Sequence, residues 1–384
     1  MNNKIKILFL HTGAELYGSD RILLSIVSNL DKKKYEALVV LPKAGPLVNE
    51  LKKNGARVRV VSYPIIRRKI FNPIGMVEYA KEYKNSCRKL LKIVQDENIE
   101  IVHSNTVAVL EGIYLKKRSK VVLISHIHEM IENPKFVARF LYGIHVKYAD
   151  RILCVSNAVK KHMEKSVGIN AKKLVVIHNG IKPIEKEKTD FRKVHSIPEN
   201  AEVFAVIGRI NAIKGQDDFI DAIKGAREEN DNLYGLIVGD AFSGQEWRID
   251  KMKAKISECG LDEYIKYVGF IEDTKKVYSA MDVLVLPSVQ SDSFPTVVLE
   301  AMSCGIPTIA YKCGGVEEMI KDGENGYLVD MHDVKMLSGK MAGISPSGMH
   351  NNCVSRFQSE FSLEKFMYNI DRLYSDLVSE SRVK

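Results

Sequence analysis

Short apolar runs rich in β-branched residues alternate with segments of helical periodicity along the first half of the chain. Strand candidates cover residues 4–10, 35–41, 56–62, 99–104, 120–127, 151–156 and 173–178, and apolar residues recur at helical spacing over 20–30 and 76–97. This alternation is typical of a doubly wound parallel sheet with helices on both faces.

The same pattern restarts after Asn179-Gly180, with strand candidates at 203–208, 234–240, 265–270, 282–288, 307–312 and 327–330. We therefore predict two Rossmann-like α/β domains, residues 1–183 and 184–364, facing each other across a cleft. A charged helix at about 365–384 is expected to pack back on the first domain. Ligands of open α/β sheets bind at the carboxyl ends of the strands, so we expect the site between the domains.

Composition agrees with a soluble globular protein of 384 residues, with 45% hydrophobic and 27% charged residues. No apolar run approaches the roughly 20 residues of a membrane-spanning helix. The N-terminal apolar stretch fits a first buried strand better than a secretion signal, so we expect a cytoplasmic protein. Six cysteines without a CxxC pair argue against a zinc site and against a disulfide framework.

Positive charge is concentrated in the first half of the chain. Residues 1–182 carry 33 Lys and Arg against 15 Asp and Glu, which leaves 24 against 33 for the remainder and a formal net charge of +9 overall. The asymmetry indicates either an anionic partner of the first domain or a solvated surface with excess lysine.

Two loops carry signals for phosphate binding. Gly13 and Gly18 lie between the first strand and the first helix, where they either turn and cap the helix or leave its amides open to an anion. Neither a dinucleotide fingerprint nor a P-loop is present. Arg209 and Lys214 follow the first strand of the second domain, and a guanidinium with an ammonium there suits a diphosphate.

Two acids mark a third candidate, in the stretch that begins at Ser291. Asp292 precedes a predicted helix and Glu300 lies about one turn inside it, among apolar residues. A buried acid needs a partner, so Glu300 either accepts hydrogen bonds from a ligand's hydroxyl groups or forms an internal salt bridge.

His126 and His128 end a predicted strand, and we expect their rings on opposite faces, which would make them a poor pair of metal ligands. There is also no DxD triplet to hold a metal-bound diphosphate.

In their order and spacing, these segments resemble the retaining GT-B glycosyltransferases of family 4. The resemblance runs through YGSDRILL, SHIHE, IGRINAIKG, SFPTVVLEAMSCGIPTIA and CGGVEEMI, among others, and covers nearly the whole chain. It implies transfer of a sugar from a nucleoside diphosphate to an acceptor hydroxyl with retention at the anomeric carbon. No metal and no cofactor are expected.

The resemblance also assigns roles to matching positions. Arg209 and Lys214 would bind the donor diphosphate, Glu300 the donor ribose, and His128 and Asp292 would be the catalytic residues beside the donor sugar. Further donor contacts are expected at Gly18, Gly208, Ser293, Phe294, Pro295, Thr296 and Val297. Asp292 stands where the family has the longer Glu, and Pro295 lacks the N–H that Gly supplies in many members.

For the donor we expect a UDP-sugar first and GDP-mannose second. The acceptor is expected to be a glycan or a polyprenyl-diphosphate-linked sugar of bacterial envelope or capsular polysaccharide synthesis. Basic and apolar residues mix in the loop of Arg67, Arg68, Lys69 and Phe71, which suggests peripheral contact with the anionic inner face of the cell membrane or local packing.

Three other functions stay open at this stage. A GT-B sugar-nucleotide 2-epimerase would keep the fold, and a sugar-nucleotide sensor without catalysis would keep the donor site. A nucleic-acid-binding protein would use the basic half, but aromatic residues interleaved with the basic ones are sparse, so we expect no nucleic-acid partner.

Overall fold

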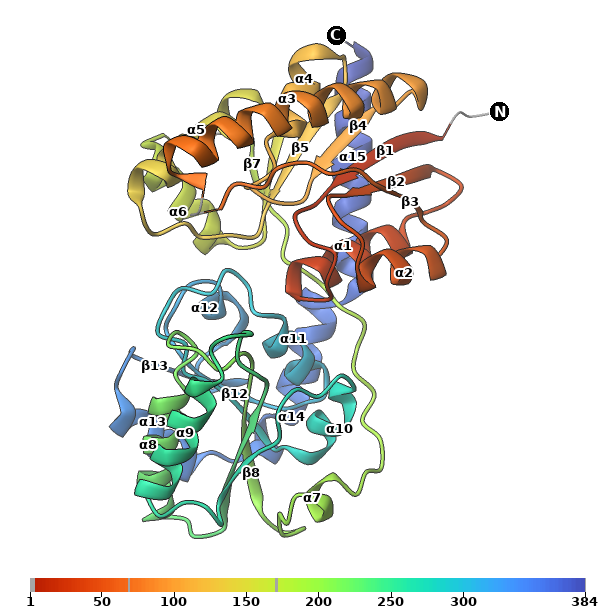
Figure 1. The fold of residues 1–384 in the computed structure, drawn as a ribbon. Helices are drawn as coiled ribbons and strands as arrows, with labels where there is room; N and C mark the ends of the chain where they lie inside the picture. Colours follow the sequence, from red (N-terminus) through yellow and green to blue (C-terminus); the bar gives the residue numbers. More distant parts are fainter. Residues whose placement is uncertain (1–3, 68–69, 170–171, 384) are drawn as a thin grey trace. The chain divides into compact units, whose positions relative to one another are not determined.

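Two parallel sheets form the framework of the chain, each in a unit of its own (Figure 1). The computed structural model describes residues 4–67, 70–169 and 172–383. Unit 1 is Met1–Gly180 together with Leu363–Lys384, and unit 2 is Ile181–Ser362. The two predicted Rossmann-like doubly wound domains are confirmed.

Unit 1 contains a seven-stranded sheet in the order β3-β2-β1-β4-β5-β6-β7, and every pair of neighbours is parallel. Its strands other than the edge strand β3 are largely apolar because helices cover both faces of the sheet, whereas β3 is mostly exposed. They are β1 (Ile5–Leu10), β2 (Tyr35–Leu41), β3 (Arg57–Val60), β4 (Ile101–Ser104), β5 (Val122–Ile127), β6 (Arg151–Cys154) and β7 (Leu174–Val176).

The helices of unit 1 connect these strands by crossovers. They are α1 (Gly18–Asn29), α2 (Pro46–Lys53), α3 (Pro73–Asp96), α4 (Glu111–Arg118), α5 (Lys135–Tyr148) and α6 (Asn157–Val167). The chain runs outward from β1 in one direction and from β4 in the other. Right-handed crossovers therefore place α1 and α2 on one face and α3 to α6 on the opposite face.

The C-terminal helix α15 (Leu363–Val383) belongs to unit 1 and lies along its sheet (Figure 1). Phe366, Ile370 and Tyr374 are buried at a spacing of four residues, which places them on one helical face. The hydroxyl of Tyr374 lies 2.7 Å from Nδ1 of His103, on β4. The last segment of the chain thus completes the core built by the first 180 residues.

Unit 2 contains a six-stranded parallel sheet in the order β10-β9-β8-β11-β12-β13. The strands are β8 (Glu202–Ile207), β9 (Leu233–Val238), β10 (Ile265–Tyr267), β11 (Val283–Leu286), β12 (Thr308–Tyr311) and β13 (Gly326–Val329). The helices are α7 (Phe191–Val194), α8 (Gln216–Arg227), α9 (Trp247–Glu258), α10 (Thr274–Ala280), α11 (Thr296–Ser303), α12 (Val316–Met319), α13 (Val334–Gly343) and α14 (Pro346–Arg356), followed by the π-helix η2 (Phe357–Phe361).

Each sheet has one place where the direction of winding reverses. In unit 1 it lies between β1 and β4, and in unit 2 between β8 and β11. The connections that leave two such strands run to opposite faces, so a crevice opens at their carboxyl ends. These two crevices are where each unit is expected to bind a ligand.

Candidate functional site

The loop after β8 is fixed against the ends of both neighbouring strands, β9 and β11. Gly208 donates its backbone N–H to the Val238 carbonyl at 2.9 Å. Gly215 has a φ of +70°, and a Cβ there would lie only 1.8 Å from the carbonyl oxygen of Pro287, directly after β11. No other residue fits that position without moving the backbone. The loop between these glycines therefore stays at the switch point of unit 2.

Both predicted diphosphate ligands extend from this loop. The ammonium of Lys214 lies 2.6 Å from Oδ2 of Asp292, and each side chain is about one quarter exposed, at 26% and 25%. The guanidinium of Arg209 lies over the ring of Phe242, with its central carbon 3.9 Å from the ring centroid. The structure thus brings Lys214 and Asp292 into contact and holds Arg209 by a cation–π interaction.

A pair of glycines positions the loop that contains Asp292 and Ser293. Gly315 donates its N–H to the Asp292 carbonyl at 2.8 Å. A Cβ on Gly314 would lie 2.3 Å from that same oxygen, and one on Gly315 would lie 2.0 Å from the Ser293 carbonyl oxygen. Phe294 is buried beside them. The pair lies in the segment CGGVEEMI and was not among the predicted site residues, although adjacent glycines do signal close backbone approach.

Glu300 lies on α11 and is 8% exposed. Its Oε2 accepts a hydrogen bond of 2.6 Å from the hydroxyl of Tyr278, on α10. Tyr278 is therefore a hydrogen-bond partner of this buried carboxylate, and the sequence analysis did not predict it. Pro295 immediately precedes α11, and Thr296 and Val297 form its first turn, half-buried.

In unit 1 the loop before α1 is organised by Asp20. Its carboxylate accepts the backbone N–H of Tyr17 at 3.0 Å and lies 2.5 Å from Nε2 of His11. Gly18 is the first residue of α1, and a Cβ there would meet nothing within 4 Å. Crowding therefore does not require glycine at position 18, and the space beside it is open.

A chain of hydrogen bonds leads from His11 to His128. The amide nitrogen of Asn105 lies 3.1 Å from Nδ1 of His11, and its oxygen lies 3.1 Å from Nε2 of His128. His11 directly follows β1 and Asn105 directly follows β4, the two strands of the switch point in unit 1. The amide donates to one imidazole and accepts from the other, which fixes the tautomers and the orientation of His128.

The expectation that His126 and His128 lie on opposite faces is wrong. Their ring centroids are 4.0 Å apart, because positions i and i+2 of an extended strand share a face. Nδ1 of His126 also lies 3.2 Å from Nε2 of His103. Burial lowers the pKa of His128 to about 3, with His11 and His103 as smaller causes, so the imidazole is neutral near pH 7.

Two of the four residues assigned to the acceptor or membrane side fall outside the described residues, namely Arg68 and Lys69. Arg67 is exposed and Phe71 is 48% exposed. Among residues 4–67, 70–169 and 172–383, no three His, Cys, Asp or Glu side chains gather closely enough to hold a metal ion. Nor does any helix in those ranges combine the length and apolarity needed to cross a membrane.

Two family profiles match the chain. The profile of the glycosyl transferases group 1 matches residues 187–352, and that of Glycosyltransferase Family 4 matches residues 17–184. Together they account for most of unit 2 and most of unit 1.

Relatives of known activity match over most of their length. A UDP-Gal:alpha-D-GlcNAc-diphosphoundecaprenol alpha-1,3-galactosyltransferase of Escherichia coli is 25% identical over 398 residues, with 98% of each chain covered. An N-acetyl-alpha-D-glucosaminyl L-malate synthase of Bacillus anthracis is 23% identical, over 81% of this chain and 84% of that one. The solved structure of Anabaena HepE in complex with UDP has a TM-score of 0.83 at 21% identity, with 97% of this chain and 100% of that chain covered, which shows the shared fold.

The glycine pair generates a stability prediction. We expect Gly315→Ala to lower the free energy of unfolding by about 1–3 kcal/mol, because the new Cβ forces the backbone away from Ser293. The matched control is Gly339→Ala in α13, where a Cβ meets nothing within 4 Å and helix propensity raises stability by about 0.5–1 kcal/mol. Urea unfolding measures both changes, and equal effects would contradict the assigned close contact.

Proposed function

Because the chain belongs to the group 1 glycosyltransferases of family 4, we propose that it is a retaining transferase that moves a sugar from a nucleoside diphosphate to an acceptor hydroxyl. One observation carries this proposal. Arg209, Lys214, Asp292 and Glu300 all come from the loops and the helix that follow β8 and β11, the two strands at the switch point of unit 2.

The proposed donor contacts are those that the family resemblance implies, and the charges at this crevice are compatible with them. Arg209 and Lys214 bind the diphosphate, which replaces the carboxylate of Asp292 as partner of Lys214. Asp292 then turns to hydroxyl groups of the donor sugar. Glu300, oriented by Tyr278, accepts hydrogen bonds from the ribose, and the backbone from Ser293 to Val297, with that at Gly208, borders the donor.

In the proposed reaction, the acceptor hydroxyl oxygen bonds to the anomeric carbon while the bond from that carbon to the diphosphate oxygen breaks, and the hydroxyl proton passes to the leaving diphosphate. Negative charge gathers on the leaving diphosphate, and two fixed cations stabilise it, so we propose that no metal is required. His128 of unit 1 is neutral and held by Asn105, which suits a hydrogen bond with a hydroxyl group of the donor sugar.

The Escherichia coli relative supports a particular pair of substrates. Its name specifies UDP-galactose as donor and a GlcNAc-diphospholipid as acceptor. We propose a UDP-sugar as the donor here, with GDP-mannose as the second choice, and a polyprenyl-diphosphate-linked glycan as the acceptor. We propose that this reaction takes place in the cytoplasm, as a step in the synthesis of envelope polysaccharide or of a lipid-linked glycan.

A lipid-linked acceptor fits a peripheral position on the inner face of the cell membrane. Three apolar side chains at the start of α3 are exposed, Ile74 at 73%, Met76 at 61% and Val77 at 70%, and the segment before α3 contains the exposed side chains of Phe71 and Arg67. Apolar side chains beside basic ones bind anionic lipid surfaces by shallow insertion and charge attraction.

Sedimentation with vesicles tests this membrane contact. We expect Val77→Ser to lower the fraction bound to vesicles that contain phosphatidylglycerol, because it removes an apolar side chain from the lipid boundary. The matched control is Val194→Ser in unit 2, at a valine that is 65% exposed. If the unmodified protein bound equally to vesicles with phosphatidylglycerol and to vesicles of phosphatidylcholine alone, the proposal would be contradicted.

Thermal unfolding with UDP, GDP, ADP and dTDP, without metal, tests the donor assignment. We expect one nucleotide, UDP first, to raise the melting temperature by roughly 5–10 °C at about 100 times its Kd, because ligand binding stabilises the folded state. Arg209→Ala should abolish the rise, and Arg88→Ala, at an exposed arginine of α3, should retain it. No shift with any nucleotide in folded protein would overturn the transferase proposal.

A further inference from the structure

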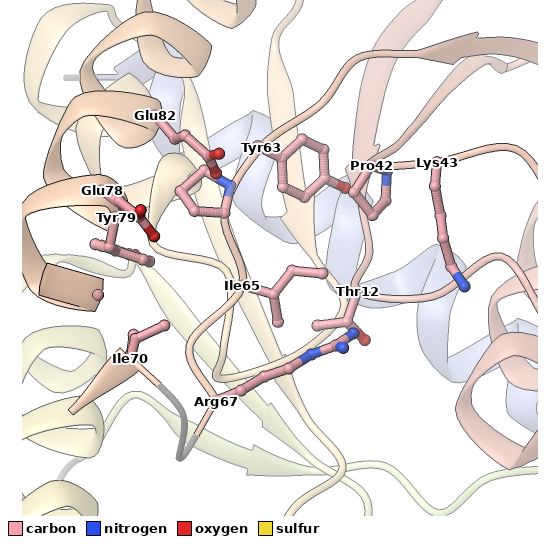
Figure 2. Close-up of a pocket in the computed structure, with 12 residues that line it drawn as sticks. Thr12, Pro42, Lys43, Tyr63, Ile65, Arg67, Ile70, Glu78, Tyr79 and Glu82 are labelled. Carbon is pink, nitrogen blue, oxygen red and sulfur yellow. The ribbon is translucent and has the colours of Figure 1, made fainter. Parts of the chain in front are cut away.

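Unit 1 has a cavity at each end of its parallel strands. The cavity at the carboxyl end, shown in Figure 2, has Arg67 on the loop after β3 and Glu78 and Glu82 on α3, so charges of both signs line it. The second cavity lies at the amino end of the strands, and its volume is about 470 Å³. That volume is within the range of roughly 300–1,000 Å³ for sites that bind small molecules.

Parts of three helices and three strands form this second cavity. The last turns of α4, α5 and α15 border it, and the chain at the start of β5, β6 and β7 completes it. Three apolar residues among them, Val122, Ala149 and Leu377, are buried. Charged side chains therefore form most of the surface that a ligand would meet.

Positive charge exceeds negative charge in the second cavity. The cations are Lys116, Lys120, Lys147, Arg151 and Lys173, and the carboxylates are Asp150 and Glu380. Each carboxylate already has a partner, because Nζ of Lys116 lies 2.6 Å from Oδ2 of Asp150 and Arg151 lies 2.7 Å from Oε1 of Glu380. Five cations against two carboxylates leave an excess of three positive charges.

The excess charge belongs to three lysines. Within the part of the chain that the structure describes, Lys120, Lys147 and Lys173 form no ion pair with a carboxylate. Lys173 donates to the Ala149 carbonyl at 2.7 Å, which fixes its ammonium at the cavity. Lys147 lies over the ring of Tyr148, with its nitrogen 5.3 Å from the ring centroid. These contacts orient two of the lysines and neutralise none of them.

The pKa of Lys173 agrees with this excess of positive charge. Burial lowers that pKa, and the neighbouring cations Arg151 and Lys116 lower it further, while Asp150 acts in the opposite direction. An ammonium whose pKa is lowered by nearby cations gains when an anion binds beside it, because opposite charges attract.

We propose that this cavity binds a soluble polyphosphate, that is, a chain of linked phosphate groups. One phosphate group carries about two negative charges, which is too few for three lysines, whereas linked phosphates supply the rest. The lysines bind as point charges, and Arg151 adds a guanidinium fork when the ligand replaces Glu380 as its partner. The basic excess of residues 1–182 thus includes a site for an anionic partner.

The position and lining of the cavity separate this ligand from the donor, the acceptor and the membrane. The strands of unit 1 run from the cavity toward the crevice between β1 and β4, so the two lie at opposite edges of the sheet. Shallow insertion into a lipid surface needs exposed apolar side chains, and Val122, Ala149 and Leu377 are buried. The inference does not depend on the proposed function.

Calorimetric titration of the full chain with inorganic triphosphate, without metal, tests the site. Every sample contains Arg209→Ala, because this change in unit 2 removes a cation of the proposed donor site and leaves the cavity intact. We expect triphosphate to bind at least about tenfold more tightly than orthophosphate. Lys120→Ala combined with Lys147→Ala should weaken triphosphate binding by about tenfold or more, since two charge-assisted contacts are lost.

The matched control removes the same charge elsewhere on unit 1. Lys84→Ala combined with Lys89→Ala changes two exposed lysines of α3 that do not line the cavity, and it should leave the affinity for triphosphate nearly unchanged. Equal losses in the two double variants would show attraction to net charge alone and would overturn the site. Absence of triphosphate binding before the lysines are changed would overturn it as well.

A change at Glu380 should act in the opposite direction. Glu380→Gln removes the carboxylate that competes with the ligand for Arg151, and an exposed ion pair of this kind contributes at most about 1 kcal/mol. We therefore expect the affinity for triphosphate to rise by about two- to fivefold. Glu364→Gln, at an exposed glutamate of the same helix, should leave it unchanged. An unchanged or lower affinity in Glu380→Gln would overturn the site.

Two soluble sources present the proposed chemistry, inorganic polyphosphate and the triphosphate of a nucleotide. Titration with inorganic triphosphate and with ATP separates them. Equal affinities would support a site for the phosphate chain alone, and tighter binding of ATP would support a nucleotide as the ligand. If Lys120→Ala with Lys147→Ala weakened binding to phosphatidylglycerol vesicles and to neither soluble probe, the proposal would be overturned.

Discussion

The reversal of winding in each parallel sheet is the constraint on which the rest of the structure depends. At that point two adjacent strands send their connections to opposite faces, and the backbone at their carboxyl ends stays uncovered. In unit 2 these strands are β8 and β11, and in unit 1 they are β1 and β4. The cations and acids of unit 2 and the histidine–asparagine chain of unit 1 each lie at such a point, although none of these residues is adjacent in sequence to its partners.

Close backbone contacts fix the positions of the two loops that border the crevice of unit 2. Gly215 against Pro287 and the glycine pair at 314–315 against Asp292 and Ser293 hold two loops within van der Waals distance. The contact between Lys214 and Asp292 then follows from where the loops are held. As a partly exposed pair it contributes at most about 1 kcal/mol, so it is a weak contact that a doubly charged phosphate group can replace.

Much of the fold could be predicted from the sequence because buried parallel strands leave a strong apolar signal. The second strand was predicted with the same bounds that the structure shows, Tyr35–Leu41. The family and the fold class are also confirmed. Helix α14 was not predicted, because its sequence contains Gly348 and two asparagines, which are weak helix formers. It forms because Met349 and Cys353 pack into the core beside α11, and this burial outweighs the poor local propensity.

The candidate site was predictable only in part. A strand end followed by Arg209 and Lys214, or an acid inside an apolar helix, is visible in one segment of sequence. The partner of Glu300 on α10 and the cavity around Arg67 depend on segments that are distant in sequence, so no local pattern reports them. The expectation for the rings of His126 and His128 failed for a different reason, namely a misapplied strand period. The site roles themselves stay predictions.

The anomeric configuration of the product tests the central claim most directly. The protein would be incubated with UDP-α-galactose and a GlcNAc-diphospholipid, and the glycosidic linkage determined from the proton coupling constant at the anomeric carbon. The account predicts an α-linked product with one UDP released per bond formed, and loss of both with Arg209→Ala. A β-linked product would contradict retention, and product formation unaffected by Arg209→Ala would contradict the assigned donor site.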